Sequence, residues 1–275
     1  MAWPWAAAGL SVDPGPDTTW SSGTKFITEP AAVAVDDTGA PRACGSRAVL
    51  VAARRGSGLH LARPFTSMTI DDPALTRAYL RWVIETAGGR RRRPTLMVVV
   101  PALSRPEITG MWRQLAESVG VRPLVVERPI AALAGLGIDA AEGTAHMVVD
   151  AERDATEVAV VADGSVVDVR QTSPLSIDVA ATAAAIRSLV VTIDPDFELD
   201  IADQGIHLVG REVADARLAA ELAARVGFPV NMAKDPGRVV IAGAQRTMET
   251  VRPYLAQVLS RRRVGVKGVR GGFAR

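Results

Sequence analysis

With 275 residues, 48% of them hydrophobic, the chain is long enough to bury a core in one large or two small domains. A formal net charge of +2 and an aromatic content of 4% argue against a stacking surface for nucleic acid, so no nucleic-acid partner is expected. The single cysteine, Cys44, excludes an intrachain disulfide and a cysteine-rich metal site, which favours a reducing, cytoplasmic setting.

The first part of the sequence predicts short strands followed by a helix. Residues 25–36 are typical of two strands joined at a proline. Residues 47–54 form an apolar run that predicts another strand. Asp71 or Asp72 is expected to cap the next helix, with Pro73 in its first turn, where a missing N–H costs nothing.

The middle of the sequence alternates between strands and helices. Residues 98–100 are all valine, as expected of a strand that is covered on both faces. Strands separated by helices pair in parallel, because a parallel connection needs a crossover. The predicted elements are a strand over 95–100, a helix over 106–119, a strand over 123–127 and a helix over 129–135.

The second half repeats this plan, with hairpin strands followed by strand–helix units. Because glycine and small residues cluster at 137–143, we divide the chain there into lobes of residues 1–138 and 139–260 and a basic tail of residues 261–275. The predicted elements of this half are strands over 145–150, 157–162, 166–171, 205–209 and 229–232, helices over 178–191, 212–226 and 238–259, and a turn at 194–196.

Three segments carry a family resemblance. Residues 94–104 read Pro-Thr-Leu-Met-Val-Val-Val-Pro-Ala-Leu-Ser, residues 125–135 read Val-Val-Glu-Arg-Pro-Ile-Ala-Ala-Leu-Ala-Gly, and residues 27–34 read Ile-Thr-Glu-Pro-Ala-Ala-Val-Ala. They resemble, in order, segments of the MreB branch of the actin-like superfamily, and the resemblance spans roughly residues 9–259. It implies an α/β, actin-like, two-lobed fold with mixed sheets flanked by helices and a nucleotide cleft between the lobes.

One departure from the family concerns the second lobe. Between the predicted strands that end at Gln171 and begin at Gly205, the sequence provides one helix and one turn. The family inserts a whole subdomain at this point. The second lobe is therefore expected to lack its inserted subdomain.

The resemblance also implies where a nucleotide would bind. In the family two hairpins hold the phosphates, and a third loop lies beside the adenosine. The residual nucleotide-site positions in this chain are Asp13, Gly15 and Thr19 in the first hairpin, Asp150 and Thr156 in the second, and Gly210 in the adenosine-side loop.

The two hairpins have lost groups that phosphate binding needs. Backbone N–H groups approach a phosphate chain closely only where side chains are absent, so such loops are rich in glycine. Pro14 and Pro16 remove amide donors from the first hairpin. Glu152, Arg153 and Asp154 stand where the second hairpin of the family has three glycines. Magnesium usually needs the phosphates as co-ligands, so no metal site is expected.

Arg128 stands where the family has the carboxylate that positions the attacking water. A guanidinium stays protonated and cannot accept the proton of that water. The three histidines lie far apart in the sequence without ligand spacing, so they predict no zinc site. We therefore expect no catalytic residue and no bound cofactor. The alternative is ATP with magnesium, with Arg153 or Arg211 neutralising phosphate charge.

The function implied by the resemblance is that of a cell-shape or cytoskeletal scaffold without ATP hydrolysis. It would act by protein–protein association with cell-wall synthesis or cell-shape proteins, with a full-length MreB, or with further copies of the chain. The alternative is a divergent, polymerising, ATP-binding actin with weak ATPase activity. A third interpretation is a membrane-surface adaptor that never polymerises.

The two ends of the chain are candidates for membrane contact. No run of eighteen apolar residues predicts a spanning helix, and the N-terminus lacks the basic flank of a secretory signal. Tryptophan prefers the lipid headgroup layer, and arginine is attracted to anionic lipid. A peripheral position at the inner membrane surface is therefore expected to involve Trp3, Trp5, Arg261, Arg262 and Arg263.

Overall fold

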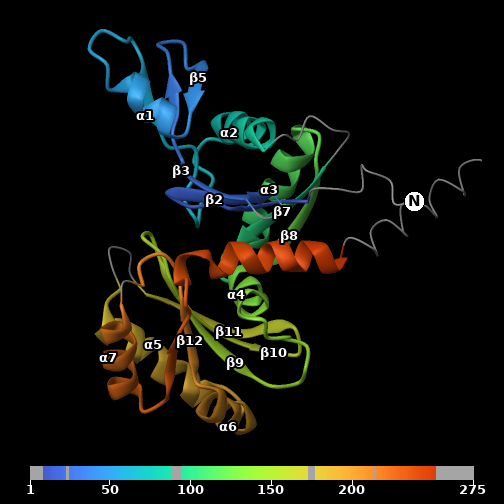
Figure 1. Ribbon diagram of the computed structural model, residues 1–275, viewed down its shortest axis with the longest axis vertical. Coiled ribbons are helices and arrows are strands. Elements are labelled where there is room, and N and C mark those ends of the chain that lie inside the picture. Colours follow the sequence, from blue (N-terminus) through green and yellow to red (C-terminus); the bar gives the residue numbers. More distant parts are fainter. Residues whose placement is uncertain (1–8, 23–24, 88–93, 173–176, 214, 252–275) are drawn as a thin grey trace, which may run out of the picture.

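The structure is a computed structural model that describes residues 9–22, 25–87, 94–172, 177–213 and 215–251. Two lobes lie one above the other in Figure 1, with two helices between them. The first lobe consists of β1 (Leu10–Asp13), β2 (Asp17–Ser22), β3 (Lys25–Pro30), β4 (Val33–Val35), β5 (Pro41–Cys44), α1 (Ser46–Ala52), β6 (His60–Ala62), α2 (Pro73–Thr86), β7 (Thr95–Val100), α3 (Pro106–Ser118) and β8 (Arg122–Glu127).

The main sheet of the first lobe has the order β3-β2-β1-β7-β8. β1, β2 and β3 pair antiparallel, whereas β7 and β8 extend the sheet in parallel from β1. Leu10 and Val12 face α2 and α3, while Ser11, between them, faces the opposite side, where the two interlobe helices lie. Both faces of β7 are thus covered, which explains its continuous run of apolar residues.

The predicted start of α2 is confirmed. The Asp72 side chain accepts hydrogen bonds from the backbone N–H groups of Ala74 at 2.8 Å and Leu75 at 2.9 Å. Pro73 occupies the first helical position. The cap satisfies amides that a helix start leaves without partners, so the sequence signal and the structure agree.

The predicted strand over residues 47–54 is wrong, because this segment forms α1. Glu29 accepts a hydrogen bond from the backbone N–H of Ser46 at 2.6 Å, and Gly45, at φ 65°, turns the chain into the helix. Ala48 is fully buried, whereas Leu50 is 67% exposed. The helix therefore packs Ala48, with Val51 and Ala52 beside it, against the separate small sheet of β5, β4 and β6 at the top of Figure 1.

The second lobe repeats the topology of the first, with the order β11-β10-β9-β12-β13. Its first three strands are again antiparallel and its last two parallel, so the predicted repeat of the plan is confirmed. Its elements are β9 (His146–Ala151), β10 (Thr156–Ala162), β11 (Ser165–Thr172), α5 (Val179–Thr192), α6 (Pro195–Gln204), β12 (Ile206–Val209), α7 (Ala216–Val226), β13 (Val230–Met232) and a short 3-10 helix (Pro236–Arg238).

Two helix predictions in this lobe need correction. The predicted turn at 194–196 is the start of α6, since Asp194 caps a helix that opens with Pro195. α7 begins at Ala216 rather than at residue 212, because Asp215 caps it there through the amides of the next turn. Among the described residues between β11 and β12, only α5 and α6 are found, in agreement with the expected loss of an inserted subdomain.

Two helices separate the sheets: α4 (Arg128–Leu136) and a helix whose described part covers residues 239–251, drawn orange-red in Figure 1. They cross without side chains between them. A Cβ added to Gly243 would lie 1.7 Å from the carbonyl oxygen of Ala131, and one added to Gly135 would lie 2.1 Å from that of Val239. Glycine at both positions is what permits this contact of two backbones.

The helix over residues 239–251 is also tied to the first sheet by polar contacts. The side-chain oxygen of Gln245 accepts hydrogen bonds from Ser11 at 3.3 Å and from Ser21 at 3.1 Å, all within the buried interior. The predicted division of the chain at residue 138 falls directly after α4. The predicted remainder of the last helix and the tail over 261–275 lie outside the described residues.

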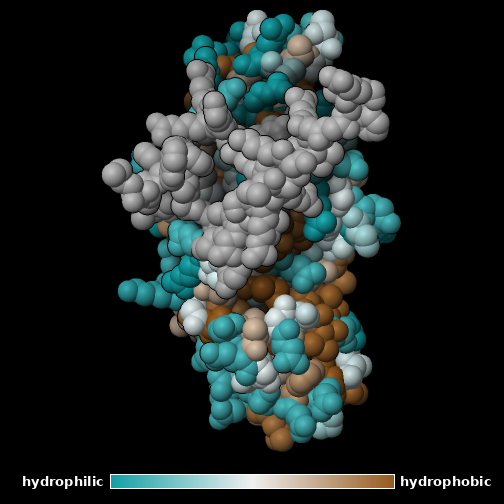
Figure 2. Space-filling model, turned by 90° about the vertical axis from the view of Figure 1, so that its right-hand side faces the viewer, coloured by the Kyte–Doolittle hydropathy of each residue, from teal (hydrophilic) through white to brown (hydrophobic). Residues whose placement is uncertain are grey.

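Apolar side chains reach the surface of the second lobe. Val167, Val191 and Leu199 are 49%, 84% and 69% exposed. Figure 2 shows apolar area on the lower lobe of the face that it presents. None of the helices within the described ranges has the length and apolar character needed to cross a bilayer. Trp3, Trp5 and Arg261–Arg263 lie outside the described residues.

Candidate functional site: an ionic cluster between the lobes

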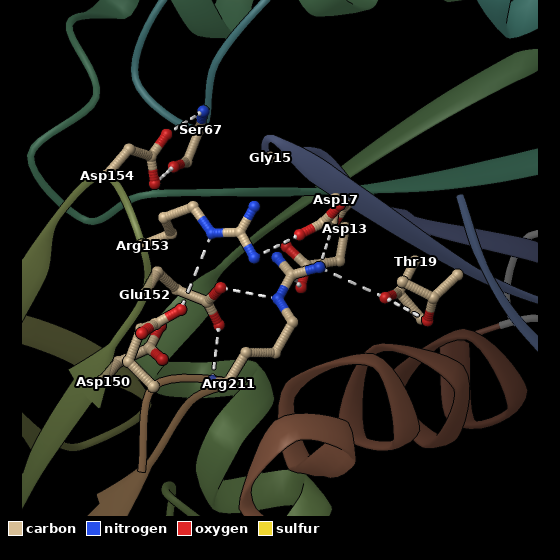
Figure 3. A network of polar contacts seen from close by, with 12 residues as sticks. Asp13, Gly15, Asp17, Thr19, Ser67, Asp150, Glu152, Arg153, Asp154 and Arg211 are labelled. Carbon is tan, nitrogen blue, oxygen red and sulfur yellow. Dashed lines mark hydrogen bonds and ion pairs between the residues drawn. The ribbon is translucent and has the colours of Figure 1, made fainter. Parts of the chain in front are cut away.

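The candidate site lies where strand ends of the two lobes face each other. β1 of the first lobe ends at Asp13, and Asp150 lies near the end of β9 in the second. Their residues are 3% and 2% exposed, although carboxylates are rarely buried without partners. Figure 3 shows both among the charged side chains that converge on this point from different elements.

Arg128 is the partner that both aspartates share. It opens α4 and is 2% exposed. Its Nη1 donates to Asp13, its Nε to Asp150, and its Nη2 to Glu152 at 2.9 Å. Burial alone would lower the pKa of the guanidinium, but the three carboxylates raise it, so Arg128 remains charged. One cation is thus surrounded by acidic groups from β1 and from the β9 end.

Arg211 is a second cation, and it reaches from the second lobe to the first. Its Nε donates to Glu152 at 2.6 Å. Its Nη1 donates to the carbonyl oxygen of Asp17 and, at 3.3 Å, to the hydroxyl of Thr19 (Figure 3). The preceding Gly210 has φ 109°, and a Cβ there would lie 2.2 Å from the oxygen of Ala151. Glycine lets the chain pass that close before Arg211 turns into the cleft.

Further contacts connect the lobes around this cluster. Asp154 accepts hydrogen bonds from the backbone N–H of Ser67, at 2.8 Å, and from its hydroxyl. Arg153 pairs with Asp17 at 3.0 Å (Figure 3).

Glu157 connects the lobes at another point. It accepts from the amides of Ala102 at 3.1 Å and Leu103 at 3.2 Å. Those amides belong to the loop after β7, so the second lobe binds the first at the carboxyl end of this strand.

The structure brings most of the predicted nucleotide-site positions together around these arginines. Asp13, Asp150 and Thr19 contact them directly. A Cβ on Gly15 would lie 2.9 Å from Nη2 of Arg211, so the side chain of this arginine covers the first hairpin. Thr156 begins β10 and is buried, but the polar contacts of the cluster described above do not include it.

A triphosphate and its metal do not fit this arrangement. The cavity lined by Arg128, Asp150, Glu152 and Glu157 has a volume of about 10 Å³. That is room for about one water molecule, whereas pockets for small molecules measure roughly 300–1,000 Å³. Among the described residues no three acidic, cysteine or histidine side chains form a metal site. The guanidinium of Arg128 lies between the carboxylates that a metal would need.

The buried cluster carries an imbalance of charge. Asp13, Asp150 and Glu152 face two guanidiniums, and Oδ1 of Asp150 is buried with no hydrogen-bond partner among the described residues. Burial raises the pKa of Glu152 to about 7, although Arg128 and Arg211 oppose the shift. The cluster is therefore expected to hold a proton near neutral pH.

Glu152 should make stability depend on pH in a defined direction. Its pKa is raised from 4.5 to about 7 on folding, so the folded state binds more protons than the unfolded state between these values. The contribution of Glu152 to the free energy of unfolding therefore falls as the pH rises through this window and is constant above it. Urea unfolding of the wild type and of Glu152→Gln, from pH about 5 to about 8, measures the free energy of unfolding of both proteins. The wild type should lose stability relative to Glu152→Gln as the pH rises. Parallel curves would contradict the assignment.

Sequence reasoning identified the loss of phosphate-binding groups but not the ion pairs that replace them. It treated Arg128 as the replacement of a carboxylate and Glu152 as the replacement of a glycine. The signal that could have revealed them was the opposite charge of Arg128 and Glu152, which lie 24 residues apart in the chain and belong to the same cleft. Ser67, Ala102 and Leu103 gave no signal, because two of them contribute only backbone amides and Ser67 is an ordinary loop residue.

The chain is similar to known proteins in sequence and in structure. A family model described as "MreB/Mbl protein" matches residues 20–178, which is over half of the chain. The cell shape-determining protein MreB of Escherichia coli (strain K12) is 31% identical over 170 residues, covering 58% of this chain and 49% of the relative. The same values hold for that protein of Salmonella typhimurium (strain LT2). The chain spans about half the length of the curated relatives it matches.

Solved structures confirm the predicted actin-like fold. MreB5 of Spiroplasma citri bound to ADP has a TM-score of 0.80 at 14% identity, covering 92% of this chain and 99% of that chain. The MamK double helical filament has a TM-score of 0.68 at 16% identity, covering 88% and 99%. At these identities the likeness shows the fold alone.

Proposed function

Because the chain belongs to the MreB/Mbl family, we propose that it is an MreB-like scaffold that acts by protein–protein association and does not hydrolyse ATP. The observation that supports this most directly is Arg128, buried between Asp13 and Asp150 in the cleft. A guanidinium can neither accept a proton from water nor leave the chain. The similarity to the cell shape-determining protein MreB of Escherichia coli supports a role beside cell-shape or cell-wall synthesis proteins, with a full-length MreB as one candidate partner.

A thermal-shift titration with ATP and magnesium tests the nucleotide part of this proposal. A ligand at 100 times its Kd stabilises the protein that binds it by about 2.7 kcal/mol. We expect no shift of the melting temperature for this chain, because Arg128, Arg211 and Glu152 fill the cleft.

The MreB of Escherichia coli serves as the comparison in the same titration. A nucleotide-dependent shift for this chain, with ATP hydrolysis that is lost in Asp150→Ala, would instead establish the alternative, a divergent, polymerising actin with ATPase activity. Hydrolysis without loss in Asp150→Ala would place the reaction outside this cleft.

Self-association is the second element of the proposal. MamK is recorded as a double helical filament, and its fold is similar to that of this chain. Val191 and Leu199 are exposed apolar side chains of the second lobe, and Figure 2 shows apolar area on that lobe. A contiguous apolar patch marks a surface that other proteins cover. Other copies of the chain are therefore proposed as partners beside the cell-shape proteins.

Membrane contact is proposed from the sequence of the two ends. We expect the chain to pellet with anionic liposomes and versions without residues 1–8 or 261–275 to pellet less, because these segments contain Trp3, Trp5 and Arg261–Arg263. Neutral liposomes are the control for the attraction of the arginines to anionic lipid, because they lack the negative surface charge. Equal pelleting of all three proteins would refute the contact.

A further inference from the structure

We propose that the ionic cluster around Arg128 and Arg211 is a built-in clamp that holds the two lobes closed without any nucleotide. The inference rests on the proposed function and extends it. A protein of this fold that does without nucleotide needs another means of fixing the position of its lobes. The clamp assigns that role to side chains of the chain itself.

Arg128 and Arg211 each form bonds across the cleft in addition to one pair within their own lobe, Arg128 with Asp13 and Arg211 with Glu152. Arg211, after β12, reaches Asp17 and Thr19 of β2. Arg128, at the boundary of the first lobe, reaches Asp150 and Glu152 of the second. Pulling the lobes apart would break these bonds together, because each has one partner on either side.

The cluster also reproduces the charge pattern of a bound ligand. Arg128 is a cation held between Asp13 and Asp150, which is where a metal would be held by acidic strand ends. The carboxyl group of Glu152 lies in the second hairpin and accepts a hydrogen bond from Arg211 at 2.6 Å. These groups are attached to the chain, so closing the cleft requires no association with a separate molecule.

Contacts farther from the centre bridge the lobes at separate places. Asp154 binds the Ser67 loop of the first lobe, and Glu157 binds the amides of the loop after β7. Between the lobes, α4 and the helix over residues 239–251 are in backbone contact at Gly243. The lobes are therefore joined by a helix crossing and fastened by the cluster.

The distance between the lobes in solution tests the clamp. Spin labels on Leu50→Cys and Arg217→Cys, in a Cys44→Ala background, lie on exposed positions of α1 and α7. These helices lie on the same side of the cleft in Figure 1, so their separation reports its opening. Pulsed electron resonance should give one narrow distance distribution for the otherwise unchanged protein, with or without ATP and magnesium. Arg128→Ala with Arg211→Ala should broaden it and shift it to longer distances.

Arg225→Ala is the matched control, since it removes an exposed arginine of α7 that pairs with Glu221 at 3.2 Å within the same helix. It should leave the distribution unchanged. If the double variant does not fold, Asp154→Ala decides the question, because it removes a bridge to Ser67 at the margin of the cluster. It should broaden the distribution less than the double variant would.

The outcomes separate the clamp from the proposed function. An unchanged distribution in the double variant, or in Asp154→Ala where that variant decides, overturns the clamp even if the wild type ignores ATP. A wild type that binds ATP without a change of distance, together with an opened double variant, supports the clamp and overturns the nucleotide part of the proposed function. A wild-type distribution that shifts when ATP and magnesium are added overturns both.

Discussion

Replacing Arg128 by methionine is expected to lower the free energy of unfolding by about 3–5 kcal/mol. Methionine keeps an unbranched apolar stem but removes the charge that Asp13, Asp150 and Glu152 share. Asp150 would remain buried without its cation, and Asp13 and Glu152 would keep only Arg211. An unpaired buried charge costs far more than the pair contributes. Urea unfolding followed by circular dichroism measures the loss, with the midpoint falling at an unchanged slope.

Two further variants give this prediction its controls. Arg225→Met removes an exposed arginine from a surface pair, and such pairs contribute about 0–1 kcal/mol. Arg128→Met combined with Asp13→Asn and Asp150→Asn should recover part of the loss, because the unpaired charges are then removed as well. A loss for Arg128→Met as small as that for Arg225→Met would show that the cluster is not buried in solution.

Gly243→Ala is expected to destabilise the protein by about 3 kcal/mol or more, as overpacking does when the neighbour cannot move. The added Cβ would lie 1.7 Å from the carbonyl oxygen of Ala131 and 2.5 Å from the backbone nitrogen of Gly135. Both atoms belong to the backbone of α4, so the two interlobe helices would have to separate. Equilibrium unfolding measures the effect, and the Ser11 and Ser21 contacts of Gln245 should weaken with it.

Gly110→Ala is the matched control for this substitution. Gly110 lies within α3, and a Cβ there would meet nothing within 4 Å. Alanine is favoured over glycine inside a helix by roughly 0.5–1 kcal/mol, so Gly110→Ala should stabilise the protein. If the two variants change stability in the same direction, the helix crossing is not as close as described.

Much of the fold was predictable, since local signals define most of its elements. The capping of α2 by Asp72 and the continuous apolar run of β7 led to correct predictions. In both cases the signal lies within a few consecutive residues of the sequence. The repeated topology also followed from the order of strands and helices, which is a property of the sequence pattern.

The wrong prediction at α1 has a physical reason. A short run of apolar residues fits a buried strand and a helix equally well by periodicity. Here the helix is favoured by Glu29, which lies 17 residues earlier and accepts a hydrogen bond from the backbone N–H of Ser46 at the start of α1. α6 was missed for a different reason, because Pro195 after Asp194 signals a helix start as well as a turn.

The residues of the candidate site were predicted, but the ion pairs between them were not. The sequence showed that glycines were replaced by charged residues and that Arg128 stands in place of a carboxylate. It did not show that Arg128 binds Asp13, which is 115 residues away in the chain. Pairings of this kind depend on how elements far apart in the chain pack against each other, which no local pattern specifies.

The covalent attachment of Arg128 has a consequence for any polymer that the chain joins. A nucleotide that is hydrolysed after assembly tells older subunits from newer ones, whereas a guanidinium on the main chain is the same on every subunit at all times. In a polymer of such subunits, the state of this cleft would not distinguish older subunits from newer ones. Its turnover would follow from subunit concentration and from whatever other molecules cap or sever it.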